Sequence, residues 1–588
     1  MSIQDLIIQK HLRDQDQLDV IFSRDKSIVV TAPAGCGKTT TMISKIAWEL
    51  SSGNIAHNKR ILAMTYSVAG AMRIRESLKT LLPSLVNNPD SYLRRVDVSN
   101  YHQFAMKLLR RYGSVLHKNL MDVNDFEIVD ENNRVLILML IDSELRVFHE
   151  FNEAIKNSDK NIINKHAASY WEILENKLIP AKLITYNGIL ITAIKLLQES
   201  KEIREFYQKY YQMIIVDEFQ DTNYLGYFFL CNLIGDNRTV FMGDDIQRIY
   251  GFIGAINDLF IRVKHKYNSK EYYLKTNYRF PANPYLRALD ELFRDYGENY
   301  HPSELNANLY FRSFDSDNKE LAFVADGITT ILKDSTNKVA VLVRAGYQGY
   351  PLAMELERRR ITYFNSLYKE TDDEYKKFYQ VAYEEFHNTT HNNKALMKDL
   401  KTCFKSVKSR EKDIVTNENN RFIFISLLKL MKILFEQAKQ WNCSPEERFN
   451  QIDFTLGNNG LKHMMEYMDE RVVLSTIHSA KGLEWQYIII PGLVSYGFPP
   501  SPICRLCRDV HSNCNQGYNY CENKFNQGME KVFKEEISVL YVALTRARKN
   551  VFFTASNGVN QWNFPKRTSC LMNLPGLKMV DYAWENCL

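Results

Sequence analysis

Long hydrophobic runs are missing from this chain of 588 residues. No stretch approaches the roughly 18 consecutive apolar residues by which a membrane-spanning helix is recognised. The first residues, MSIQDLIIQKHLRDQDQ, mix charged and apolar side chains where a signal peptide would have an apolar core. We therefore expect a cytoplasmic protein with no membrane partner.

Glycine, proline and cysteine are also scarce, with 24, 15 and 10 residues. The low glycine and proline content excludes collagen-like and low-complexity chains. Cysteine is too sparse for a disulfide scaffold, so we expect most of the cysteines to be free thiols. The remaining composition, 45% hydrophobic and 24% charged, is that of a globular protein. Its length predicts roughly three to five folding units.

A strong excess of one charge is absent as well. The chain has 75 Lys and Arg against 69 Asp and Glu, a net charge of +6. Such a mild charge permits a nucleic-acid partner without requiring one. Local basic and aromatic surfaces, and not an overall field, would have to hold a polyanion.

Short β-branched runs that end in polar residues are the first positive signal. Residues 28–31 lead into a loop of small residues, residues 214–216 end at Asp217 and Glu218, and residues 240–242 end at Gly243. Buried strands of this kind are typical of a parallel sheet whose functional site lies at the carboxyl ends of its strands. Similar runs at 339–343, at 472–476 and in NVFFTAS indicate a second α/β core.

Two long stretches without such runs have helical spacing of their apolar residues. The stripe that includes Met431 and Phe435 is expected to form the core of a helical bundle. The predicted fold class is α/β, with two parallel-sheet cores that each carry a mostly helical insertion. The predicted domains are a first core in 1–111 and 181–270 with an insertion at 112–180, and a second core in 271–365 and 470–588 with an insertion at 366–469 and a cysteine-rich insert at 501–525.

The segment APAGCGKT, residues 32–39, fits the phosphate-loop pattern, with Ala32 where the first glycine usually stands. Gly35 and Gly37 allow backbone N–H groups to curl around a phosphate, Lys38 supplies a point charge, and Thr39 offers a hydroxyl to Mg²⁺. The expected nucleotide-binding residues are Ala34, Gly35, Cys36, Gly37, Lys38, Thr39 and Thr40.

The acidic pair Asp217 and Glu218 supplies the second half of a nucleoside-triphosphatase site. One carboxylate, that of Asp217, would hold the metal, and Glu218 would orient and deprotonate water. The expected cofactors are ATP and Mg²⁺.

Six ordered motifs then resemble the UvrD/Rep/PcrA family of superfamily 1 DNA helicases. They are RDQDQLDVI around Gln17, VDEFQDTN at 216–223, GDDIQRIYGFIGA at 243–255, LKTNYRF at 274–280, LSTIHSAKGLEW at 474–485 and LYVALTRAR at 540–548. The resemblance implies two RecA-like P-loop cores that close on ATP, and 3′→5′ translocation on single-stranded or tailed duplex DNA.

The same resemblance assigns roles to individual residues. Gln17 would read the adenine, Tyr278 would stack on it, Glu484 would bind the ribose, Gln247 would sense the γ-phosphate, and Arg279 and Arg546 would act as arginine fingers. The expected DNA contacts are Thr65, Tyr66, Ser67, Tyr101, His102, Tyr250, Phe252 and His478.

Some family positions hold other residues, among them Ile246, Arg248 and Ile253 in the third of these motifs. Two other functions therefore stay open. The chain could be a DNA-sensing ATPase subunit that activates a partner nuclease or another repair or antiphage-defence protein, without processive unwinding. Alternatively, it could be an interaction scaffold with a vestigial motor, an interpretation that the intact ATPase residues oppose.

Four of the ten cysteines, Cys504, Cys507, Cys514 and Cys521, lie close together in the sequence. Four thiolates can form a structural Zn²⁺ site, with His511 as a substitute for one ligand. An iron–sulfur cluster could use the same thiolates. Free thiols in a loop are the third interpretation, because only one C-x-x-C pair is present.

Overall fold

Two α/β units, Met1–Arg279 and Phe280–Leu588, make up the chain. The computed structural model describes residues 2–129, 133–249, 254–256, 258–280, 283–441, 443–457, 459–500, 530–559 and 566–587. The first unit extends beyond the boundary that we expected after residue 270, because strand β8 (Lys270–Tyr273) pairs with β1 (Ser27–Thr31) of the first sheet.

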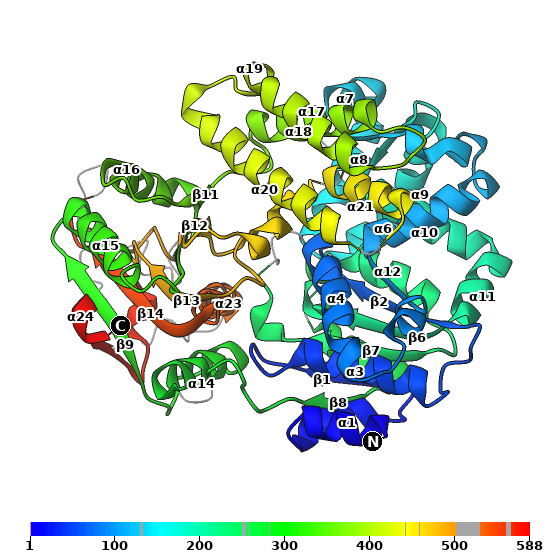
Figure 1. Ribbon diagram of the computed structural model, residues 1–588. Helices are drawn as coiled ribbons and strands as arrows, with labels where there is room; N and C mark the ends of the chain where they lie inside the picture. Colours follow the sequence, from blue (N-terminus) through cyan, green and yellow to red (C-terminus); the bar gives the residue numbers. More distant parts are fainter. Residues whose placement is uncertain are drawn as a thin grey trace. The chain divides into compact units, whose positions relative to one another are not determined.

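The first sheet has six parallel strands in the order β3-β2-β6-β7-β1-β8. The strands not yet given are β2 (Arg60–Thr65), β3 (Val96–Asn100), β6 (Tyr211–Asp217) and β7 (Arg238–Gly243). Helices follow β1, β2, β3, β6 and β7, and the helices of this unit lie on both faces of the sheet (Figure 1). The helices of the core are α1 (Ile3–Lys10), α2 (Gln15–Phe22), α3 (Lys38–Ser51), α4 (Val68–Leu81), α5 (Pro89–Leu93), α6 (Tyr101–Tyr112), α10 (Tyr186–Glu199), α11 (Lys201–Tyr210), α12 (Tyr224–Leu233) and α13 (Leu259–Tyr267).

Side chains of the central strands alternate between two apolar cores. Ile28 and Val30 of β1 pack with helices α1 to α4, whereas Val29 between them packs on the opposite face with α6, α10 and α12. Both faces of the sheet are therefore buried. This explains why the central strands β1, β6 and β7 contain continuous apolar runs and do not alternate with polar residues.

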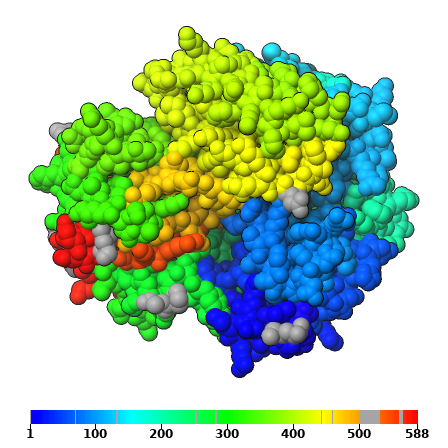
Figure 2. All heavy atoms as spheres, in the orientation of Figure 1, coloured from blue at the N-terminus to red at the C-terminus, as the bar shows by residue number. Residues whose placement is uncertain are grey.

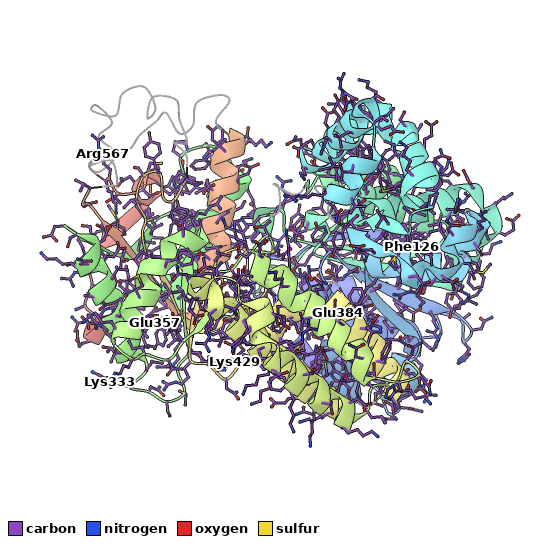
Figure 3. The ribbon with its side chains drawn as sticks, turned by 90° about the horizontal axis from the view of Figure 1, so that it is seen from above. Phe126, Lys333, Glu357, Glu384, Lys429 and Arg567 are labelled. Carbon is purple, nitrogen blue, oxygen red and sulfur yellow. The ribbon has the colours of Figure 1, made fainter. Side chains whose placement is uncertain are left out.

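The first insertion is built from α7 (Arg134–Met139), α8 (Asp142–Lys156) and α9 (Lys160–Ile173). The ring of Tyr170 stacks on Phe148 and Phe151, with centroids 5.1 and 4.3 Å apart. A short strand that we did not predict, β4 (Glu127–Val129), pairs in parallel with β5 (Leu183–Thr185). Phe126, next to β4, marks this region in Figure 3.

The second sheet has seven strands in the order β11-β12-β10-β13-β14-β9-β15, and all of its pairs are parallel. Its strands are β9 (Ala307–Phe314), β10 (Val339–Val343), β11 (Phe364–Ser366), β12 (Val472–Thr476), β13 (Trp485–Ile490), β14 (Ala547–Ser556) and β15 (Leu577–Val580). The helices of this core are α14 (Pro284–Glu298), α15 (Asp317–Ile331), α16 (Tyr350–Arg358), α23 (Glu530–Leu544) and α24 (Trp584–Cys587). The two parallel sheets confirm the predicted fold class.

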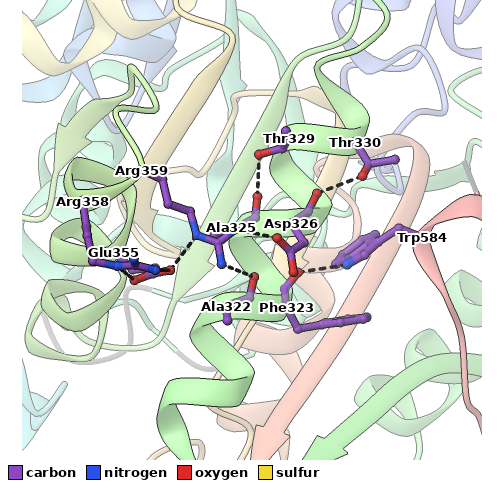
Figure 4. Close-up of polar contacts among 10 residues, drawn as sticks. All are labelled: Ala322, Phe323, Ala325, Asp326, Thr329, Thr330, Glu355, Arg358, Arg359 and Trp584. Atoms are coloured by element: carbon purple, nitrogen blue, oxygen red, sulfur yellow. Dashed lines mark hydrogen bonds and ion pairs between the residues drawn. The ribbon is translucent and has the colours of Figure 1, made fainter.

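Polar contacts join α15 to α16 and to α24 beside this sheet (Figure 4). Arg359 forms ion pairs with Glu355 of α16 and with Asp326 of α15. The indole Nε1 of Trp584 donates to the carbonyl oxygen of Phe323 on α15 at 2.9 Å. A Cβ atom at Gly327 would overlap the Trp584 ring, so this close approach requires glycine.

The second insertion is also helical, as predicted. It contains α17 (Asp373–Thr389), α18 (Met397–Ser409), α19 (Glu411–Ile414), α20 (Arg421–Gln440) and α21 (Pro445–Gly457). Met431 and Phe435 of α20 are buried, which confirms that the apolar stripe forms a helical core. Glu384 on α17 and Lys429 on α20 are labelled in Figure 3. None of the helices in the described ranges is both long enough and apolar enough to cross a membrane.

A buried charge network fixes α3 to the first sheet. Glu49 has no exposed surface, and its carboxylate oxygens lie 2.7 Å from Nζ of Lys45 and 2.6 Å from Nη1 of Arg238 on β7. The Lys45 ammonium also donates to the carbonyl oxygen of Ser23, which follows α2. The carboxylate therefore neutralises two cations from neighbouring elements.

We predict that Glu49→Gln lowers the free energy of unfolding of the first unit by about 3–5 kcal/mol, because two cations lose their shared counter-charge. Chemical denaturation followed by circular dichroism would measure the change. The control is Glu199→Gln, which breaks an exposed pair with Lys195 on α10 and should cost less than about 1 kcal/mol. Equal effects of the two substitutions would contradict the prediction.

Candidate functional site

The loop of residues 32–37 joins β1 to α3 at the carboxyl edge of the first sheet, and the phosphate-loop motif continues into α3 with Lys38 and Thr39. Gly35 and Gly37 adopt left-handed backbone conformations with φ of 82° and 76°. Helix α3 begins at Lys38, so its first N–H groups, which have no partner within the helix, face the loop. This geometry fits the binding of a phosphate group.

The three charged residues predicted for catalysis lie together beside this loop. Nζ of Lys38 is 3.0 Å from Oδ1 of Asp217 and 2.6 Å from Oε1 of Glu218. Burial opposes the charge on Lys38, but the two carboxylates outweigh burial and raise the pKa of Lys38 above its ordinary value. Glu218 has a left-handed backbone with φ of 50°, an uncommon conformation for a residue with a side chain.

Gln220, which we did not predict, orients Glu218. Its Nε2 donates to Oε2 of Glu218 at 2.6 Å, and its Oε1 accepts from the backbone N–H of Asp244 at 3.1 Å. The Asp244 side chain in turn accepts from Nε2 of Gln247 at 2.8 Å. A Cβ atom at Gly243 would overlap the Gln220 amide, so a larger residue at the end of β7 would displace that amide from its partners. The ends of β6 and β7 thus share one polar network.

Residues 277–279 lie against the phosphate loop from the end of the first unit. Nδ2 of Asn277 donates to the carbonyl oxygen of Ala34 at 3.0 Å, and the N–H of Tyr278 donates to that of Gly35 at 2.8 Å. A Cβ atom on Gly35 would lie 2.7 Å from Cβ of Arg279. The structure therefore places Tyr278 and Arg279, two predicted site residues, at the loop.

Gln17 and Tyr278 meet at one end of the loop. Nε2 of Gln17 donates to the carbonyl oxygen of Cys36 at 3.0 Å, and the side chain of Gln17 is buried. Asp14 connects Gln17 and Tyr278, because its carboxylate accepts from the Tyr278 hydroxyl at 2.6 Å and from the backbone N–H of Gln17 at 3.3 Å. The Tyr278 residue is 38% exposed, which leaves part of its ring available for stacking.

The donor set beside Lys38 fits a magnesium ion. Oδ1 of Asp217 is buried and accepts no hydrogen bond from the residues that the structure describes. It forms an ion pair with Lys38. Thr39, in the first turn of α3, adds a hydroxyl. One carboxylate and one hydroxyl suit Mg²⁺, which usually keeps waters and phosphate oxygens as its other ligands. No group of three or more His, Cys, Asp or Glu side chains gathers at metal-binding distance in the ranges that the structure describes.

Comparison with known proteins agrees with this geometry. A model of the UvrD/REP helicase N-terminal domain matches residues 13–268, and a model of the UvrD-like helicase C-terminal domain matches residues 365–558. The chain belongs to the UvrD-like DNA helicase family. Two similar proteins are a probable DNA helicase II homolog of Mycoplasma genitalium, 22% identical over 95% of this chain and 86% of that protein, and DNA helicase II of Rickettsia typhi, 22% identical over 92% of each.

Three predicted residues of the UvrD-like helicase motifs belong to the second unit. Glu484 precedes β13, and its Oε2 accepts from Nε of Arg548 at 2.9 Å. Arg546 precedes β14, is buried, and donates from Nε to the carbonyl oxygen of Val542 at 2.9 Å. Since Trp485 pairs with Ala547, Glu484 and Arg546 lie at the starts of neighbouring strands. His478 follows the end of β12.

Several predicted DNA contacts lie near the carboxyl edge of the first sheet. Thr65 ends β2 and is in register with Asn100 of β3 and Asp217 of β6. Its side chain is fully buried beneath the start of α4, so it does not offer its hydroxyl to DNA in this structure, and that expectation is corrected. Tyr66 is half-buried, and Ser67 caps α4 by accepting from the N–H of Gly70 at 2.9 Å. His102 is half-buried, and burial lowers its pKa to about 4, so its ring is neutral at pH 7.

Tyr101 does not present a face to DNA in this structure, and that expectation is corrected. Its side chain is fully buried, and its hydroxyl lies 3.0 Å from Oγ1 of Thr222. The ring faces inward because the first residue of α6 packs onto the sheet, a direction that the motif alone does not reveal. Tyr250 and Phe252, like the cysteines 504, 507, 514 and 521, lie outside the described residues.

A row of lysines on α18 is a further surface that the sequence analysis missed. Lys398, Lys401, Lys405 and Lys408 are exposed, and their spacing of three and four residues places them on one face of the helix. Their ammonium groups have no carboxylate partner within the ranges described. The nearby carboxylates of Glu384, Glu385, Asp413, Glu411 and Glu418 pair instead with Arg410 and Arg421. The surface of this helical insertion is yellow-green in Figure 2.

We predict that Gly35→Ala weakens binding of a fluorescent ATP analogue at least tenfold, since backbone strain of about 1–3 kcal/mol adds to the overlap with Arg279 and Asn277. Equilibrium titration would measure the affinity. The control is Gly53→Ala, because Gly53 has a similar φ of 72° but no atom within 4 Å of an added Cβ. Equal affinities of the two variants would show that the contacts of Gly35 do not matter.

Proposed function

We propose that this chain is an ATP-dependent DNA translocase and helicase that hydrolyses ATP at the phosphate loop and moves 3′→5′ along single-stranded DNA. The observation that carries the proposal is the cluster of Lys38, Asp217 and Glu218 beside the glycine-containing loop. The direction of movement and the DNA substrate are inferred from the resemblance of the motifs. Proteins named DNA helicase II among the relatives support the same substrate.

In the proposed reaction Lys38 changes partners. The triphosphate of ATP offers its ammonium group new oxygens, so Lys38 turns from the carboxylates to the β- and γ-phosphates. Asp217 and Thr39 would hold Mg²⁺, which neutralises charge on the phosphate oxygens when it is bound. Glu218, released from Lys38, accepts a proton from the water that attacks the γ-phosphate. The bond between the γ-phosphorus and the oxygen bridging to the β-phosphate breaks, and ADP leaves.

Neighbouring side chains would orient this reaction. Gln220 holds Oε2 of Glu218 and leaves its other oxygen toward Lys38. Arg279 lies beside Gly35 and can neutralise charge that develops on the phosphate. The roles proposed for Gln247, Arg546, Glu484 and His478 rest on their motif positions. Base contacts by Tyr66 and His102, with a phosphate contact by Ser67, would form the DNA track in the first unit.

We predict that Glu218→Gln lowers the DNA-stimulated ATPase rate by about 10²–10⁴-fold, since it removes the general base, and leaves ATP binding intact. Steady-state hydrolysis and strand displacement would be measured with single-stranded DNA, 3′-tailed duplex and 5′-tailed duplex. Glu202→Gln, at an exposed acid of α11, is the control.

The wild type should displace the strand of the 3′-tailed duplex and not that of the 5′-tailed duplex. Displacement of the 5′-tailed duplex alone would overturn the direction of movement. Stimulation of ATPase without displacement of either duplex would overturn the helicase proposal and indicate a DNA-sensing ATPase.

The lysine row of α18 is proposed to contact the phosphates of the duplex part of a tailed substrate. Replacing Lys398, Lys401, Lys405 and Lys408 together by Gln should reduce the slope of log K against log salt by up to about 0.9 for each phosphate that the protein no longer neutralises. Anisotropy titrations of tailed duplex at several salt concentrations would measure the slope.

The control variant replaces four other exposed lysines of the second unit by Gln and gives the same change of net charge: Lys333, Lys439, Lys531 and Lys578. An equal slope in both variants would show that only the overall charge matters. An unchanged slope for the α18 variant would remove this helix from the DNA-binding surface.

A further inference from the structure

We propose that His11 is a positioning residue that holds the amide of Gln17 in the orientation that selects adenine over guanine. This inference rests on the proposed function, in which Gln17 reads the base of the nucleotide. His11 lies at the end of α1, outside the phosphate loop and outside the helicase motifs described above.

The contacts form a chain from α3 to the phosphate loop. His11 is only 2% exposed, and its two ring nitrogens face different partners. Nδ1 is hydrogen-bonded to Oε1 of Gln17, and Nε2 lies 2.8 Å from Oγ of Ser44 on α3. The other end of the Gln17 amide, Nε2, donates to the carbonyl oxygen of Cys36 at 3.0 Å.

For a neutral His11 ring, only one arrangement of protons satisfies all three hydrogen bonds. The carbonyl oxygen of Cys36 can only accept, so the NH₂ end of Gln17 must face it. Oε1 of Gln17 can only accept too, so Nδ1 of His11 must carry the ring proton. The neutral ring then accepts at Nε2 from the Ser44 hydroxyl. Burial lowers the pKa of His11 and favours this neutral form.

The fixed amide keeps one N–H and one oxygen lone pair for a ligand. Adenine presents an acceptor, N7, next to a donor, the N6 amino group, so a glutamine amide can bind both at once. Guanine presents two acceptors, N7 and O6, and would place O6 against the Gln17 oxygen. His11 therefore contributes to base selection, because its hydrogen bond prevents the Gln17 amide from rotating its oxygen away from the base.

The test compares His11→Leu with His11→Asn. Leucine removes the donor at similar size, whereas the asparagine side chain can place an N–H where Nδ1 lies and should restore the bond. Affinities for ATP, GTP and inorganic tripolyphosphate are measured by competition titration, together with KM and kcat for ATP. His57→Leu, at an exposed histidine of the same unit, is the control.

We expect His11→Leu to lower the ATP-to-GTP affinity ratio by about fivefold to tenfold, the size of one hydrogen bond. KM for ATP should rise while kcat and the affinity for tripolyphosphate, which has no base, stay unchanged. His11→Asn should recover most of the ratio.

Two results would overturn the role of His11 and leave the proposed ATPase function standing. In the first, His11→Leu keeps the wild-type ratio. In the second, His11→Leu weakens tripolyphosphate as much as ATP, which shows that it disturbs the loop as a whole. A wild type that binds ATP and GTP equally would instead overturn base reading by Gln17 and with it the role of His11.

Discussion

The ion pairs of Lys38 with Asp217 and Glu218 are the interaction on which the site of the first unit depends. Two adjacent carboxylates at the end of a buried strand repel one another, and burial makes that repulsion costly. The ammonium of Lys38 compensates both charges at 3.0 and 2.6 Å. The loop after β1 is thereby fixed to the end of β6, and Gln220 extends the connection to the end of β7.

Parallel pairing explains why such distant residues can meet. Thr65 is in register with both Asn100 and Asp217, and Thr31 is in register with Gly243. Every strand of a parallel sheet ends at the same edge, so polar residues that follow separate apolar runs are collected there. The helices that cover both faces leave this edge as the place where polar groups remain accessible.

The sequence allowed prediction of the parts that depend on local pattern. The strand at residues 28–31, the glycine-containing loop after it and the acidic pair at the end of β6 follow from apolar runs and glycine spacing, and the structure has them at the expected places. Contacts between distant segments were not predictable. Gln220, Asp14 and His11 act through side-chain hydrogen bonds whose partners become neighbours only in the fold, and Tyr101 is buried because of the direction in which α6 packs.

The hydrogen bonds of residues 277–279 have a mechanical consequence. These residues are the last of the first unit, and the chain continues directly from Arg279 into the second unit at Phe280. Asn277 and Tyr278 are bonded to the carbonyl oxygens of Ala34 and Gly35. The loop of residues 32–37 would therefore bear any tension along this connecting segment, and a change in the shape of that loop would be transmitted first to residues 277–279.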